Sequence, residues 1–194
     1  MSLTEEISMP KNNNVYLLVG PRGSGKSTYC EKLVANQPEL SIVSRDAIMV
    51  RHFGSAETSS YVNPSEFIGP CMQRLIRRKI SLGKDLKLLL DAWTGDSTDR
   101  KTVISTLRWY GANRVTVLYL VTPVELVKKW FWKKPGIAQM SEIRRRQGEG
   151  LTFYSEDVPE RDYANFHKHA INIDSDGFDQ VIRVNPLEPL IFIT

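Results

Sequence analysis

A glycine-rich segment near the start of the chain constrains the fold more than any other feature of the sequence. The segment fits the pattern G-x-x-x-x-G-K-[ST] in full, and Thr28 follows it; its residues are Gly20-Pro21-Arg22-Gly23-Ser24-Gly25-Lys26-Ser27. An apolar run at 15–19 precedes it and a helix-forming stretch follows, which is the strand-loop-helix context that the pattern requires. The sequence therefore predicts a phosphate-binding loop, and an accidental glycine-rich turn is the disfavoured interpretation.

The residue types of this loop indicate its ligand. Glycines let successive backbone N–H groups turn towards phosphate oxygens, and the following helix N-terminus adds unpaired donors and a positive dipole end. Lys26 supplies a cation for the β- and γ-phosphates, and Ser27 supplies a hydroxyl ligand for Mg²⁺. We therefore expect a nucleoside triphosphate site, with ATP and Mg²⁺ as its occupants.

The rest of the chain alternates between strand-like and helix-like segments. Short apolar runs predict strands at 15–19, 40–43, 86–90, 114–121, 171–173 and 181–184. Helical spacing and capping residues predict helices at 27–35, 47–53, 66–82, 97–110 (capped by Ser97), 124–132 and 139–147, and an acidic loop at 148–163. Such alternation predicts an α/β P-loop NTPase fold, a three-layer sandwich with a central parallel sheet flanked by helices.

Length and composition place broad limits on the protein. We expect one domain over 1–194, including a helical lid at about 124–150, because the 194 residues show no break in composition. Hydrophobic residues make up 41% of the chain and charged residues 25%, with no apolar run long enough for a membrane span. The polar N-terminus does not resemble a signal peptide, so we expect a cytoplasmic protein with free Cys30 and Cys71. The oligomeric state is left open.

Two aspartates follow predicted strands, where the carboxyl edge of the sheet faces the phosphate loop. Asp46 lies in Ser44-Arg45-Asp46 after the second strand, and Asp91 ends the third. Asp46 is a candidate for orienting an acceptor hydroxyl, and Asp91 is a candidate partner of Mg²⁺. The alternative interpretation makes Asp46 a helix N-cap and Asp91 a cap or turn residue.

With these residues, the chain resembles the P-loop polynucleotide 5′-hydroxyl kinases, as a kinase domain alone. The resemblance covers about residues 15–134 and rests on the phosphate loop, Ser44-Arg45-Asp46, Leu90-Asp91-Ala92, Asp99-Arg100 and Glu125-Leu126-Val127-Lys128. It implies that Asp46 is the general base for the attacking hydroxyl, with Arg45 beside it. It also implies ATP rather than GTP, in agreement with the absence of an Asn-Lys-x-Asp guanine-recognition motif.

The chain departs from this family at several positions. Met49 stands where the family often has an arginine that contacts the phosphate next to the acceptor hydroxyl. Lys129 and Lys133 stand where its lid has two arginines, and lysine lacks the bidentate fork of arginine. The candidates for contacting the transferred phosphate are therefore Lys129, Lys133, Arg144, Arg145 and Arg146.

The segment from Lys128 to Lys134 mixes aromatic and basic residues, which suits either of two roles. Its rings can stack on the bases of a single strand while the lysines contact phosphates. Alternatively, the lid helix buries Trp130 or Phe131 against the sheet and leaves the lysines in water. We expect an ATP-dependent kinase acting on a polynucleotide 5′-hydroxyl. A kinase for a nucleoside, sugar or similar metabolite, favoured by Met49, and an NTP-binding regulatory or toxin-like module are the alternatives.

Overall fold

A sheet of five parallel strands forms the centre of the molecule. The computed structural model describes residues 12–54, 64–91, 96–134, 137 and 155–193. The strands lie in the order β2-β3-β1-β4-β5; their bounds are β1 (Asn14–Val19), β2 (Ser41–Ser44), β3 (Lys87–Asp91), β4 (Arg114–Leu120) and β5 (Gln180–Val184). This arrangement confirms the predicted parallel α/β sheet.

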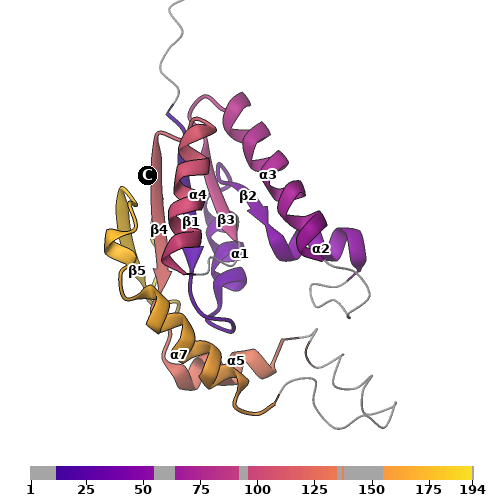
Figure 1. The fold of residues 1–194 in the computed structure, drawn as a ribbon, viewed down its shortest axis with the longest axis vertical. Helices are drawn as coiled ribbons and strands as arrows, with labels where there is room; N and C mark the ends of the chain where they lie inside the picture. The colour runs from indigo at the N-terminus through magenta and orange to yellow at the C-terminus, as the bar shows by residue number, and fades with distance from the viewer. Residues whose placement is uncertain (1–11, 55–63, 92–95, 135–136, 138–154, 194) are drawn as a thin grey trace, which may run out of the picture.

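Helices cover both faces of the sheet and give the predicted three layers (Figure 1). They are α1 (Lys26–Asn36), α2 (Arg45–Phe53), α3 (Pro64–Leu82), α4 (Ser97–Trp109), α5 (Val124–Trp132) and α7 (Val158–Ala170). Alternate residues of β1 face opposite ways, as a strand requires. Leu17 packs in one core cluster with α3 and α4, whereas Leu18 packs in another with Leu33 of α1.

The strand order places the end of β1 at the middle of the carboxyl edge of the sheet. The chain passes from β1 to β2 and β3 on one side, and to β4 and β5 on the other. Ligands of open α/β sheets bind where the strand order reverses in this way. Helices α5 and α7 pack against each other beyond the same edge (Figure 1). The glycine-rich loop after β1 therefore lies between the two halves of the sheet and beside α5.

Three expectations from the sequence are wrong. Asp96, rather than Ser97, caps α4: its carboxylate accepts hydrogen bonds from the backbone N–H groups of Thr98 and Asp99. The predicted acidic loop at 148–163 overlaps α7, which already begins at Val158. The predicted strand at 171–173 runs instead into a 3₁₀ turn, η1 (Ile173–Ser175), because the carbonyl of Asn172 accepts hydrogen bonds from the backbone and hydroxyl of Ser175. The helix predicted at 139–147 lies outside the described residues.

Two further features concern the whole described chain. Both cysteines, Cys30 and Cys71, are free thiols, as the sequence predicts. Within the described ranges, no helix is at once long enough and apolar enough for a membrane crossing.

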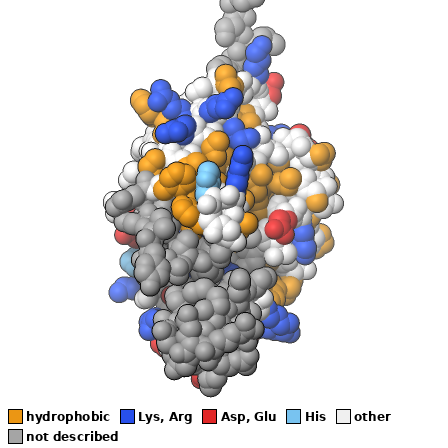
Figure 2. Space-filling model, turned by 90° about the vertical axis from the view of Figure 1, so that its right-hand side faces the viewer, with side chains coloured by type: hydrophobic (Ala, Val, Ile, Leu, Met, Phe, Trp, Pro, Cys, Tyr) orange, Lys and Arg blue, Asp and Glu red, His pale blue; other side chains and the backbone are white. Residues whose placement is uncertain are grey.

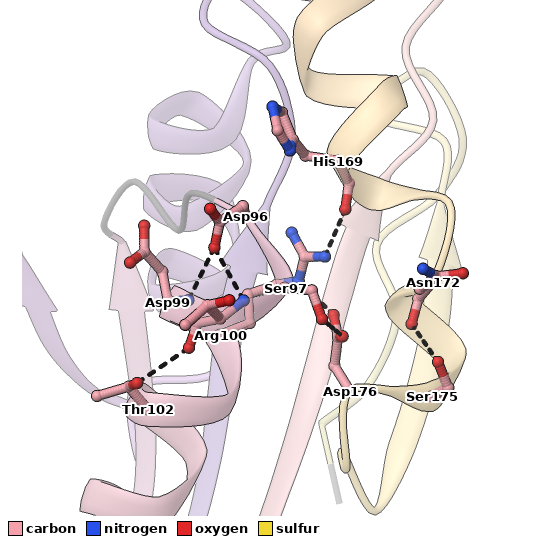
Figure 3. Close-up of polar contacts among 10 residues, drawn as sticks. Asp96, Ser97, Asp99, Arg100, Thr102, His169, Asn172, Ser175 and Asp176 are labelled. Carbon is pink, nitrogen blue, oxygen red and sulfur yellow. Dashed lines mark hydrogen bonds and ion pairs between the residues drawn. The ribbon is translucent and has the colours of Figure 1, made fainter.

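A buried ion pair joins α4 to the turn before β5 (Figure 3). The guanidinium of Arg100 and the carboxylate of Asp176 are both fully buried, with 2.5 Å between Nε and Oδ2. Ser97 donates its hydroxyl hydrogen bond to the same carboxylate, and Arg100 also donates to the carbonyl of His169 at the end of α7. The pair thus connects α4, α7 and η1 at one point, and sequence spacing gave no signal for it.

Replacing Asp176 with asparagine is expected to destabilise the fold by about 3–5 kcal/mol, because the Arg100 guanidinium would then be buried without a counter-charge. Urea denaturation of Asp176→Asn and wild type would measure this change in the free energy of unfolding. Asp174→Asn is the matched control: its carboxylate pairs with Arg183 at 2.6 Å, but both side chains are more than half exposed, so a loss of at most about 1 kcal/mol is expected. Equal losses in the two variants would contradict the prediction.

Candidate nucleotide-binding site

The predicted phosphate loop connects β1 to α1, and two of its glycines adopt conformations that other residues rarely adopt. Gly23 and Gly25 have φ angles of 85° and 88°, in the left-handed region. A Cβ atom on Gly23 would lie 2.8 Å from the carbonyl oxygen of Val127, and one on Gly25 would lie 3.0 Å from the Trp130 ring. Glycine is therefore required at both positions for the backbone turn and for the close approach of α5.

Other loop residues are held by neighbouring elements. Thr122, just after β4, donates its hydroxyl hydrogen bond to the carbonyl of Ser24 at 2.8 Å, and Ser24 itself is fully buried. Gly20 and Pro21 are buried, whereas Ser27 and Thr28 are exposed on the first turn of α1. Arg22 forms an ion pair with Asp162 of α7 at 3.5 Å. The loop is thus fixed from both sides while the start of α1 stays accessible.

The Lys26 side chain folds back along this loop. Its ammonium donates hydrogen bonds to the carbonyls of Gly20, at 2.8 Å, and Pro21, at 2.9 Å. Burial, together with the nearby positive charge of Lys134, lowers the pKa of Lys26 to about 8, although the carboxylates of Asp91 and Asp46 act in the opposite direction. The ammonium therefore lies within electrostatic range of both aspartates that the sequence singled out.

Asp91 ends β3 beside the start of α1. Its carboxyl group is buried and accepts a hydrogen bond from the Ser44 hydroxyl at 3.2 Å and another from the Ser27 hydroxyl. Desolvation raises the pKa of Asp91, and the hydrogen bonds and Lys26 oppose this rise. One carboxylate with an adjacent hydroxyl fits Mg²⁺, which usually takes few protein ligands and completes its shell with water and phosphate oxygens.

Asp46 lies in the first turn of α2, directly after β2. Ser44 is the N-cap of this helix, since its hydroxyl accepts a hydrogen bond from the backbone N–H of Ala47 at 3.3 Å. The alternative interpretation of Asp46 as the cap is therefore wrong. The Asp46 carboxylate is about half exposed and pairs with the Arg45 guanidinium at 3.1 Å. It is thus accessible from solvent at the carboxyl edge of the sheet.

The described part of the lid is α5, and it lies directly on the phosphate loop. Phe131 is fully buried, next to Gly23, and Trp130 lies against Gly25. An aromatic side chain is therefore buried as one interpretation predicted, although its neighbour is the loop rather than the sheet. Lys128 pairs with Glu160 of α7 at 2.6 Å.

The basic residues of the lid differ in how close they lie to the loop. Lys129 and Lys133 are exposed, and Arg144, Arg145 and Arg146 lie outside the described residues. Lys134, which the sequence argument did not select, is the cation whose charge most lowers the pKa of Lys26. It lies two residues beyond the end of α5, where helical spacing no longer indicates the direction of a side chain.

The fold and the loop together define an α/β protein with a P-loop kinase-like fold, which implies nucleotide binding. Residues 15–154 match the model of the AAA domain family, so the chain belongs to this family. A comparison with curated proteins found no match.

The solved structures that share the fold include the following two. A structure of the Pnkp1/Rnl/Hen1 RNA repair complex superposes with a TM-score of 0.61 at 19% identity, over 86% of this chain and 48% of that one. The PezAT chromosomal toxin–antitoxin system of Streptococcus pneumoniae gives a TM-score of 0.60 at 17% identity, over 98% of this chain and 74% of that one. The chain thus spans about half the length of the first structure.

ATP affinity is expected to fall as the pH rises above about 8. Phosphate oxygens favour the charged form of Lys26, so binding above its pKa of about 8 must take up a proton, whereas below that pH the ammonium is already charged. The dissociation constant should therefore rise up to about tenfold per pH unit above 8. Calorimetric titration of ATP between about pH 7.5 and 9.5 would measure this rise. The Lys26→Arg variant, if it binds ATP, should show a flat profile, and a flat wild-type profile would refute the prediction.

Proposed function

We propose that the protein is an ATP-dependent kinase that transfers the γ-phosphate to a hydroxyl, with the 5′-hydroxyl of a polynucleotide as the acceptor. One observation carries the proposal: the accessible Asp46 carboxylate shares a single electrostatic neighbourhood with Lys26 of the phosphate loop and with the buried Asp91. A site for hydrolysis or switching requires only the loop and a metal ligand. An exposed carboxylate beside them supplies the base that transfer to a hydroxyl needs.

In the proposed reaction, Asp46 accepts the proton of the attacking hydroxyl, and Arg45 holds the carboxylate in place through its 3.1 Å contact. The hydroxyl oxygen forms a bond to the γ-phosphorus while the bond to the β,γ-bridging oxygen breaks, leaving ADP. Lys26 exchanges its hydrogen bonds with Gly20 and Pro21 for the β- and γ-phosphates. Ser27 and Asp91 would hold Mg²⁺, which neutralises phosphate charge when bound.

A further cation is needed to balance the charge that develops on the transferred phosphoryl group. Lys133 and Arg144 remain proposed for this role from the resemblance of the lid. Lys134 is an additional candidate, because its charge already acts on Lys26 in the structure. Lysine provides a point charge, so a lid that uses it depends on distance more than on bidentate geometry.

Two observations support a polynucleotide as the acceptor. The sequence Ser44-Arg45-Asp46 matches the segment that carries the resemblance to the polynucleotide 5′-hydroxyl kinases, and Ser44 caps α2, the helix that begins with the proposed base and its arginine. The chain also shares its fold with a protein of an RNA repair complex. At 19% identity the second observation supports the proposal only through the fold.

A small-molecule acceptor is the second candidate, and Met49 favours it. This residue is fully buried in the main core cluster, so the position where related kinases have a phosphate-contacting arginine is occupied by a core side chain. A toxin-like module is the third candidate, in keeping with the fold shared with a toxin–antitoxin system. Product analysis separates the three candidates.

The experiment is transfer of label from γ-labelled ATP to a short oligonucleotide with a 5′-hydroxyl. The same oligonucleotide carrying a 5′-phosphate is the control, since it presents the same chain without the acceptor group. Label on the first oligonucleotide alone supports the proposal. Label on nucleosides or sugars but not on oligonucleotides would replace it with the small-molecule candidate, and free phosphate alone would refute a kinase for these acceptors.

A further inference from the structure

Helices α2 and α3 present a surface beside the proposed acceptor position, at the β2 edge of the sheet (Figures 1 and 2). Three rings join the two helices: Phe67 of α3 lies 5.0 Å from the ring of His52 and 5.7 Å from that of Phe53 in edge-to-face contacts. Phe67 is nonetheless 44% exposed. We call this surface the α2–α3 face and define it by Val50, Arg51, His52, Phe67, Arg74 and Arg78, all of which are exposed.

Two arginines of α3 lie along the same side of the helix as Phe67, so the three residues form a line on its surface. Arg74 and Arg78 follow Phe67 by seven and eleven residues, so the three lie within about 40° of the helix circumference. Figure 2 shows Lys and Arg side chains above the hydrophobic ones on this side of the molecule. The third arginine, Arg77, is held to one side, with its guanidinium 5.5 Å from the Trp109 ring.

The charge of this line is not neutralised by the protein itself. No acidic side chain in the described ranges forms an ion pair with Arg74 or Arg78, in contrast to the paired arginines Arg45, Arg100, Arg108, Arg161 and Arg183. Glu66 is the single acidic residue in the α3 sequence. Exposed rings next to unpaired cations are the combination that binds single-stranded nucleic acid, in which bases stack and phosphates carry the charge.

The position of the face relative to Asp46 also fits a bound single strand of nucleic acid. Asp46 lies in the first turn of α2 and His52 in its last turn, about 9 Å further along the helix axis. Phe67 meets His52, and Arg78 lies about 16 Å beyond Phe67 along α3. A chain whose 5′-hydroxyl reaches Asp46 therefore has a continuous route over several nucleotides. The described part of the lid offers fewer exposed rings and unpaired cations, because Phe131 is buried and Lys128 is paired with Glu160.

We propose that the α2–α3 face binds the single strand behind the 5′-hydroxyl, with phosphates on Arg74 and Arg78 and a base on the Phe67 ring. The inference rests on the proposed function for the direction of the strand, since it places the 5′ end at Asp46. The residues of the α2–α3 face are not among those that carry the resemblance to polynucleotide kinases, which belong to the phosphate loop, the proposed base and the lid. Residues of the middle of α3 are thereby assigned to acceptor binding.

The test compares two double variants of equal charge. One is Arg74→Gln with Arg78→Gln; the control is Lys101→Gln with Lys168→Gln, which removes two exposed charges from α4 and α7. Fluorescence anisotropy with a labelled 5′-hydroxyl oligonucleotide of about 12 nucleotides gives the affinity at several salt concentrations. Transfer of labelled γ-phosphate is measured in parallel to this oligonucleotide and to a nucleoside 3′-phosphate, which is too short to reach α3.

The arginine variant is expected to bind the oligonucleotide about tenfold more weakly, and the slope of log affinity against log salt should fall by about 1.4, or 0.7 for each lost phosphate contact. Its KM for the oligonucleotide should rise, while transfer to the nucleoside 3′-phosphate stays at the wild-type level. The control should match wild type in every measurement. An arginine variant that matches the control overturns the inference.

Two further outcomes separate the inference from the proposed function. If no 5′-hydroxyl is phosphorylated but the arginine variant still loses oligonucleotide affinity, the face binds nucleic acid and the proposed function falls. If transfer occurs and the arginine variant binds the oligonucleotide as tightly as wild type, the proposed function stands and the inference falls. An equal loss of affinity for poly-glutamate would identify an acidic protein as the occupant and would also overturn the inference.

Discussion

Lys26→Ala is expected to lower kcat/KM for phosphoryl transfer by about 10³-fold, because one cation contacts the phosphates where negative charge develops. The variant also loses the hydrogen bonds from the ammonium to Gly20 and Pro21, so the loop itself becomes less ordered. Single-turnover transfer from labelled ATP and calorimetric ATP titration would separate the loss of chemistry from the loss of binding.

The matched control for this experiment is Lys32→Ala. Lys32 lies on the same helix and carries the same charge, but its side chain is exposed. We expect the control to retain wild-type activity. Undiminished activity in Lys26→Ala itself would show that the glycine-rich loop does not bind the phosphates.

Asp46→Asn is expected to leave ATP affinity unchanged and to lower the rate of transfer by about 10²- to 10⁴-fold, which is the range for loss of a general base. Asparagine has the same shape, and its amide oxygen can still accept the hydrogen bond from Arg45 that the carboxylate accepts at 3.1 Å. The amide cannot take the proton of the acceptor hydroxyl. The rate is measured at saturating ATP with the acceptor identified by the transfer experiment.

Asp99→Asn provides the control, because Asp99 also lies in the first turn of a helix and is exposed. Its replacement tests the general effect of removing a carboxylate from a helix N-terminus, which is expected to be about 0.3–1 kcal/mol of stability. If Asp46→Asn loses ATP binding and thermal stability together, Asp46 is a structural residue and the proposed mechanism is wrong.

The sheet and the loop were predictable because their signals are local. The β1 run, the glycine pattern and the start of α1 are contiguous, and each element requires the next. Asp46 and Asp91 were found because the carboxyl ends of parallel strands share one edge. Their association with Lys26 in the structure follows from that rule, while their chemical roles stay predictions.

Other parts of the structure depend on contacts that the sequence does not indicate. Arg100 and Asp176 are 76 residues apart, so nothing in either neighbourhood marks them as a buried pair. Helix α7 was missed because its acidic start resembled a loop, although Val158, Phe166 and Ala170 recur on the side that becomes buried. Lys134 was missed because it lies beyond the end of α5, which was predicted correctly, and helical spacing does not indicate the direction of a side chain outside the helix.

The ladder between the strands sets how the reacting groups are spaced. Asp91 stands opposite Leu18 of β1 and opposite Ser44 of β2, so β2 and β3 end at the same level and β1 ends one residue further on. A shift of β3 by one residue would turn the Asp91 side chain to the opposite face of the sheet. An added residue within β3 would therefore separate Asp91 from Ser27 and Ser44. The same addition in the turn before β3, at 84–85, lies ahead of the first backbone hydrogen bond between Leu86 and β1 and would leave the alignment intact. The far edge of the sheet therefore tolerates changes of length that the strands do not.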